Sequence, residues 1–91
     1  MSERRVVIGS KVGLHARPAA LFVQAATAAP VAVTIAKDGG EPVNARSILS
    51  VLALDARGGD EVVLAADGDG ADEALDQLVQ LLLVDHDAAE G

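Results

Sequence analysis

The sequence of 91 residues contains no cysteine, which excludes disulfide bonds, thiolate catalysis and cysteine metal sites. Aromatic residues are almost missing: Phe22 is the only one, so a core has to be assembled from Val, Leu, Ile and Ala. The length suffices for one small core and is too short for two. We therefore expect a single domain over residues 1–91.

Basic residues are scarce, with seven Lys and Arg against fourteen Asp and Glu and a net charge of −7. After Asp55 the only base is Arg57, whereas in the first 36 residues a single acid, Glu3, opposes the bases Arg4, Arg5, Lys11 and Arg17. An acidic chain without aromatic stacking platforms does not fit nucleic-acid binding. The positive balance near the N-terminus instead suits a small anion.

Long apolar runs are also missing, so the sequence predicts no membrane insertion. The N-terminal residues lead straight into a strand-like segment and not into the apolar stretch of a signal peptide, which favours a cytoplasmic protein. Asp67 and Asp69 alternate with glycines, but the other ligands of a calcium-binding loop do not follow. We expect neither a metal site nor a cofactor.

Hydrophobic periodicity predicts seven elements. Strands are expected over residues 4–9, 31–37, about 42–45 and 61–66, and helices over 16–29, 48–53 and from about residue 71 to about residue 84. The order β-α-β-β-α-β-α predicts an α+β fold, in which three helices cover one face of a four-stranded antiparallel sheet. The tail from about residue 85 is expected to fray.

The informative stretch is residues 13–20, which read Gly-Leu-His-Ala-Arg-Pro-Ala-Ala. It places His15 directly before the predicted helix 16–29, where the free backbone N–H groups of the first turn attract anions. Pro18 lacks an N–H at a position where that loss costs little, so the N–H groups of Ala16 and Arg17 stay available for phosphate oxygens. The Arg17 guanidinium adds a forked cation beside them.

The same helix end disfavours protonation of His15, which keeps a lone pair on one ring nitrogen near neutral pH. Phosphoryl transfer mainly needs alignment and charge neutralisation, and helix N–H groups with one arginine supply both without a metal. Considered alone, however, a histidine before a helix is more often a cap or a solvent-facing residue. Residue chemistry leaves both interpretations open.

Two motifs together resemble the paired signature of the HPr family of the phosphoenolpyruvate-dependent phosphotransferase system. The first is the 13–19 motif, and the second is Val-Asn-Ala-Arg-Ser-Ile-Leu at residues 43–49. The resemblance extends from about residue 4 to residue 84 and implies an open-faced β-sandwich. It further implies that Enzyme I, using phosphoenolpyruvate, phosphorylates His15 on Nδ1, and that His15 passes the group to Enzyme IIA domains. The protein would be a carrier, not an enzyme, and we expect a monomer.

The resemblance also implies a second site at Ser47, where the family carries a regulatory serine acted on by a serine kinase and phosphorylase. We favour the simpler interpretation that Ser47 is only the N-cap of the 48–53 helix. Ser50 stands where families with the kinase usually have glycine, and Val12 is a second departure from the family pattern.

Partner docking is the third implication. By resemblance, the residues that would contact Enzyme I, Enzyme IIA domains or regulatory proteins are Ala20, Gln24, Ile48, Leu49 and Leu52. Of these, Leu49 and Leu52 are the stronger candidates, because Ile48, like Val51, is expected to belong to the core. Basic side chains that would ring the patch are Lys11, Arg17 and Arg46. His86, in the acidic tail, is expected to be an exposed bystander.

Two other classes of function remain as alternatives to the carrier. One is a regulatory module that binds an anion reversibly at the start of the 16–29 helix, and the other is a purely structural interaction domain. Replacing His15 by alanine separates them, because a carrier loses all function whereas a site built from backbone N–H groups and Arg17 largely survives.

Overall fold

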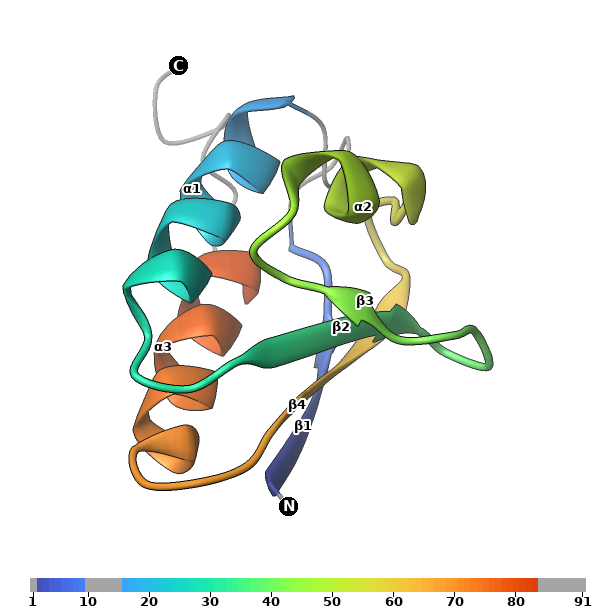
Figure 1. Ribbon diagram of the computed structural model, residues 1–91. Coiled ribbons are helices and arrows are strands. Elements are labelled where there is room, and N and C mark those ends of the chain that lie inside the picture. Colours follow the sequence, from blue (N-terminus) through green and yellow to red (C-terminus); the bar gives the residue numbers. More distant parts are fainter. Residues whose placement is uncertain (1, 10–15, 84–91) are drawn as a thin grey trace.

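The computed structural model describes residues 2–9 and 16–83 (Figure 1). The element order is the predicted one, with the bounds β1 Ser2–Val7, α1 Ala16–Ala28, β2 Val33–Lys37, β3 Val43–Asn44, α2 Ile48–Ala53, β4 Glu61–Ala66 and α3 Ala71–Leu83. The strands form one antiparallel sheet in the order β1-β4-β2-β3. The three helices lie on one side of it, which confirms the predicted fold class.

The core lies between the sheet and the helices. Alternate residues of the central strands point into it, so Val33 and Ile35 of β2 and Val62 and Leu64 of β4 are at most 1% exposed. Phe22 of α1 is fully buried against them, and α3 contributes Leu75 and Leu78. Branched aliphatic residues and alanine fill most of this volume, as the composition predicted.

Most element bounds agree with the sequence prediction, and the differences have local causes. α1 ends at Ala28, one residue early, because the Ala29 N–H turns back to Ala26 O at 3.3 Å. β2 begins at Val33, two residues late. β1 is shifted towards the N-terminus because Ser2 already pairs with Ala66. At its other end, the Gly9 N–H donates to Leu82 O of α3 and not to a strand of the sheet. The predicted frayed tail lies outside the described residues.

Edge strand β1 is attached to α3 as well as to β4. The Arg4 guanidinium reaches two carboxylates of α3, with Nε 3.0 Å from Asp76 Oδ1 and Nη2 3.3 Å from Asp72 Oδ1. Beyond the strand, the Gly9 N–H donates to Leu82 O at 2.8 Å. A Cβ on Gly9 would overlap the carbonyl oxygen of Leu83, so only glycine permits this approach. The chain therefore leaves β1 at a set place beside the C-terminal end of α3.

Two aspartates with lowered pKa values make the stability of the fold depend on pH. The pKa of Asp72 is lowered, first by a hydrogen bond from the Ser2 side chain and then by Arg4. The pKa of Asp60 is lowered, first by the backbone N–H of Arg57 at 2.9 Å and further by Lys37. A carboxyl group with a depressed pKa in the folded state stabilises the fold only while it is ionised.

We predict that the free energy of unfolding falls as the pH is lowered from about 4, the ordinary pKa of aspartate in an unfolded chain, towards the lower folded-state values. Urea unfolding between pH 2 and pH 7 measures this dependence. In Asp72→Asn and Asp60→Asn the pH dependence should be shallower, because asparagine does not titrate. A slope identical to that of the unchanged protein in both variants would contradict the assignment.

Candidate functional site

His15, the predicted phosphoryl acceptor, lies outside the described residues, and the structure describes the helix that follows it. α1 begins at Ala16, so its first turn comes directly after the histidine in the chain. Pro18 is buried within that turn and Arg17 is exposed. The first turn of α1 contains no acidic side chain that would compete with an anion for its backbone N–H groups.

The placement of this helix end is set by packing. Ala19, Phe22 and Ala26 recur at three- and four-residue spacing and are all fully buried, so one face of α1 is held against the sheet along its length. The opposite face is exposed at Ala20 and Gln24. A helix fixed in this way keeps its N-terminal N–H groups in one position, which is the preorganisation that an anion site needs.

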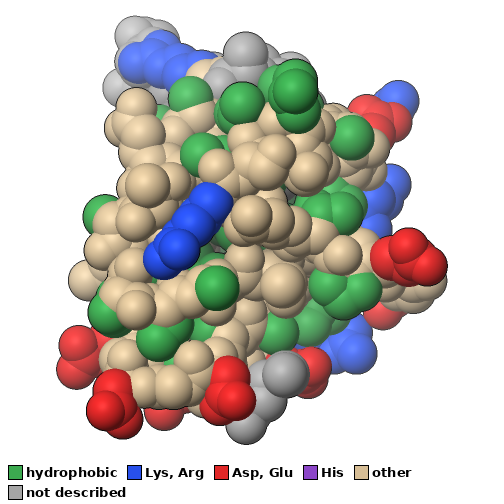
Figure 2. Space-filling view, viewed as in Figure 1, with side chains coloured by type: hydrophobic (Ala, Val, Ile, Leu, Met, Phe, Trp, Pro, Cys, Tyr) green, Lys and Arg blue, Asp and Glu red, His purple; other side chains and the backbone are tan. Residues whose placement is uncertain are grey.

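The predicted docking residues lie on the exposed faces of α1 and α2. Leu49 is 77% exposed, whereas Leu52 is half-buried and packs against the core. Val51 is fully buried, as expected, but the expectation that Ile48 belongs to the core is wrong, because this first residue of α2 is 37% exposed at its rim. Figure 2 shows hydrophobic side chains gathered at the end of this face where α2 lies.

Sequence reasoning missed Leu21, which is 36% exposed. It lies next to Ala20 and three residues before Gln24, so the helical spacing places it beside the same face of α1. Its hydrophobic character favoured the core, and only its position one residue before the buried Phe22 indicated otherwise.

Arg46, which the sequence predicts in the basic rim of the docking patch, is exposed, and its place in that rim stays a prediction. Its guanidinium donates to three carbonyl oxygens at the C-terminal end of α1, namely those of Ala26 at 3.1 Å, Ala29 at 2.9 Å and Val31 at 3.2 Å. At 1.5 Å per residue the helix is about 20 Å long, so Arg46 and Arg17 serve opposite ends of it. The remaining predicted rim residue, Lys11, lies outside the described residues.

Ser47 is the N-cap of α2, as the sequence predicted. Its backbone is extended, with φ −103° and ψ 111°, and its Oγ accepts a hydrogen bond from the Ser50 N–H at 3.3 Å. The hydroxyl oxygen thus satisfies one of the backbone donors that a helix start leaves unpaired.

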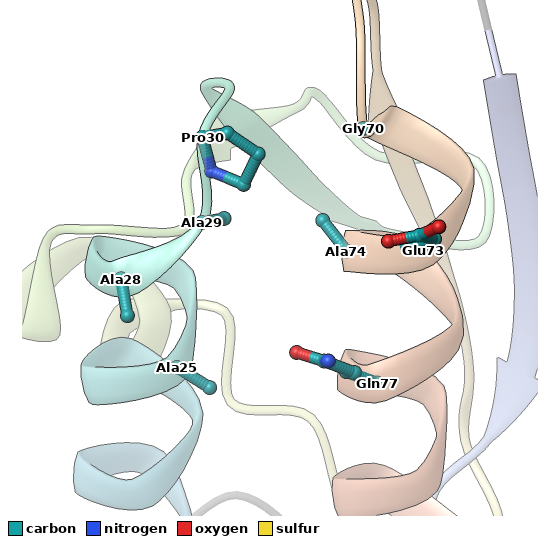
Figure 3. A pocket seen from close by; sticks show the side chains of 8 residues that line it. All are labelled: Ala25, Ala28, Ala29, Pro30, Gly70, Glu73, Ala74 and Gln77. Atoms are coloured by element: carbon teal, nitrogen blue, oxygen red, sulfur yellow. The ribbon is translucent and has the colours of Figure 1, made fainter.

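A pocket of about 280 Å³ lies at the other end of α1, between its last turns and the first turns of α3 (Figure 3). Its lining is mostly small and apolar and consists of Ala25, Ala28, Ala29, Pro30, Gly70, Glu73, Ala74 and Gln77. The negative charge of the Glu73 carboxylate would repel a phosphoryl group. Figure 2 shows further acidic side chains along this end of the face. The pocket is therefore separate from the predicted site at the start of α1.

The described residues show neither a metal-binding cluster nor a membrane-spanning helix. Within residues 2–9 and 16–83, no group of three His, Cys, Asp or Glu side chains could hold a metal ion. No helix in the same residues combines the length and the apolar character needed to cross a bilayer.

Comparison with known proteins gives a consistent result. The sequence profile of the PTS-HPr family, described as the PTS HPr component phosphorylation site, matches residues 2–83. Phosphocarrier protein HPr of Streptomyces coelicolor is 60% identical over 82 residues, which cover 90% of this chain and 88% of that protein.

Solved structures agree with the sequence comparison. The crystal structure of a phosphocarrier protein HPr from Bacillus anthracis superposes with a TM-score of 0.84 at 40% identity, covering 89% of this chain and 95% of the other. An HPr dimer from Thermoanaerobacter tengcongensis gives 0.69 at 41% identity, covering 100% of this chain and 99% of the other. With the matching fold and the helix that follows His15, these findings show that the chain belongs to the HPr family of phosphocarrier proteins.

Proposed function

We propose that this chain accepts a phosphoryl group on His15 from phosphorylated Enzyme I, with phosphoenolpyruvate as the source, and donates it to Enzyme IIA domains. The observation that supports this most directly is the start of α1 immediately after His15, with Arg17 in a first turn that holds no acidic side chain. Such a helix end stabilises the dianionic phosphoryl group of a phosphohistidine.

In the proposed step, the Nδ1 lone pair of neutral His15 forms a bond to phosphorus while the bond between phosphorus and its Enzyme I donor breaks. The backbone N–H groups of Ala16 and Arg17 bind phosphoryl oxygens, and the Arg17 guanidinium neutralises the charge that spreads over those oxygens. Transfer to an Enzyme IIA domain reverses these events with a new acceptor. Since the group enters and leaves by the same nitrogen, the protein carries it and turns over no small molecule.

The proposal includes the whole chain as a single domain that acts as a monomer in the cytoplasm. The charge of −7 supports the monomer, because copies of a strongly acidic chain repel one another. For Ser47 we propose a structural role as a helix cap, since its hydroxyl oxygen already accepts the Ser50 N–H.

We predict that incubation with phosphoenolpyruvate and Enzyme I adds the mass of one phosphoryl group, which brief acid treatment removes. Intact-mass spectrometry at neutral pH and after acid measures both steps. His15→Ala should gain nothing, because the Ala-Arg-Pro sequence that follows His15 does not follow the other histidine, His86. His86→Ala is the matched control that should gain the same mass as the unchanged protein.

Two results would reject this proposal. If Enzyme I that is active on another HPr adds no phosphoryl group, the carrier function fails for this donor and a reversible anion-binding module becomes the better account. If His15→Ala is still phosphorylated, the acceptor is a different residue.

We also predict that Leu49→Ala raises the KM for the phosphorylated carrier in transfer to an Enzyme IIA domain by about five- to thirtyfold, the effect of removing a contact worth about 1–2 kcal/mol. The kcat should be nearly unchanged, because the hydrocarbon side chain of Leu49 has no group that takes part in phosphoryl transfer. Val7→Ala is the matched control, since Val7 is 49% exposed but lies on edge strand β1. Equal KM values for the two variants would show that Leu49 makes no docking contact.

A further inference from the structure

Arg46 connects α1 and α2, which the backbone joins only through β2, β3 and the three segments around them. It directly precedes Ser47, the N-cap of α2, while its side chain lies on the C-terminal end of α1. Its Nε donates to Ala26 O at 3.1 Å, and its Nη2 donates to Ala29 O at 2.9 Å and Val31 O at 3.2 Å. The start of one helix is thus attached to the end of another.

The end of α1 depends on this contact. Its last turn contains no basic residue, although the C-terminal carbonyl groups of a helix are left without intrahelical partners and carry a partial negative charge. Arg46 supplies both the donors and the positive charge. The planar guanidinium presents its N–H groups in a fixed fork, so three acceptors on one short segment also fix the direction from which the side chain arrives.

The backbone around Arg46 is equally constrained. The Arg46 N–H donates to Asn44 Oδ1 at 3.0 Å, and the preceding residue, Ala45, is fully buried and donates its N–H to Val33 O at 3.0 Å. The Ser47 N–H donates to Asn44 O at 3.1 Å. Since the backbone is held to β2 and the Arg46 side chain to α1, the position of the first turn of α2 is fixed relative to both elements.

We propose that Arg46 is a positioning residue for partner docking. By holding the start of α2 against α1, it keeps Leu49 in register with Ala20 and Gln24, so that the two helices present one surface. This inference rests on the proposed function, because the docking of Enzyme I and Enzyme IIA on these residues is part of that proposal. If α2 moves, only a fraction of the molecules displays the complete surface, and the apparent affinity falls by that fraction.

A simple charge effect is the rival explanation, in which Arg46 attracts an acidic partner as one member of a basic rim. The two explanations differ in what replaces the arginine. A lysine keeps the charge, but its ammonium is a compact point donor that does not reproduce the fork across three carbonyl oxygens. A charge effect is also screened by salt, whereas the placement of a helix is much less affected.

The experiment compares Arg46→Met, Arg46→Lys and the control Arg4→Met, in which another inter-element arginine is lost between β1 and α3. The KM and kcat for the protein as substrate of Enzyme I and of an Enzyme IIA domain are measured at low and high salt. We expect Arg46→Met to raise both KM values about fivefold with kcat nearly unchanged, as when only about one molecule in five displays the surface. Arg46→Lys should restore the KM only in part, and Arg4→Met should leave it unchanged.

Three kinetic outcomes would overturn the proposal: an unchanged KM in Arg46→Met, a rise that Arg46→Lys or high salt abolishes, or an equal rise in Arg4→Met. The last would show a general loss of stability.

A structural measurement does not depend on transfer: residual dipolar couplings of backbone amides report whether α2 keeps its orientation relative to α1 and the sheet. We expect the α2 couplings to depart from that common frame in Arg46→Met and to stay within it in Arg4→Met. If Enzyme I fails to phosphorylate the unchanged protein, the proposed function fails, and unaltered couplings in Arg46→Met would separately reject the role of Arg46.

Discussion

The packing of α1 against the sheet is the constraint on which the rest of the structure depends. Phe22, Ala19 and Ala26 bury one face of the helix completely, so neither end can shift without exposing apolar surface. The N-terminal end follows His15 in the chain and has N–H groups that find no partner inside the helix, and the C-terminal end has carbonyl groups that find none inside it. The two ends of one helix therefore have opposite electrostatic characters: the C-terminal end binds Arg46, and the N-terminal end is the proposed anion site.

The small side chains of α1 allow this arrangement. Alanine at the buried positions brings the helix close to its neighbours, and alanine at the exposed positions leaves room for other molecules to approach its backbone. The family match, the relatives and the fold agree that this architecture serves a phosphocarrier. Loss of stability and loss of transfer are separable here, because the buried residues hold α1 whereas His15 and Arg17 are proposed to perform the chemistry.

Much of the fold could be predicted from the sequence, because periodicity and turn residues act locally. The short helix shows this well: Ser47 followed by six residues of mixed propensity was enough to predict α2 with its cap. Ile48 and Arg46 were not predictable in the same way. The exposure of Ile48 depends on where the core ends, and the contacts of Arg46 join it to carbonyl groups 15–20 positions earlier in the chain. Such contacts form only once the elements have packed, so no local sequence pattern predicts them.

The central claim is that a phosphoryl group on His15 is held by the first turn of α1. Nuclear magnetic resonance of the phosphorylated, ¹⁵N-labelled protein tests it most directly, because phosphorus couples to the nitrogen that carries it and amide protons shift when they donate to phosphoryl oxygens. The account predicts coupling to Nδ1 of His15 together with downfield shifts of the Ala16 and Arg17 amide protons. Coupling to another residue, or amide protons of Ala16 and Arg17 that do not move, would contradict it.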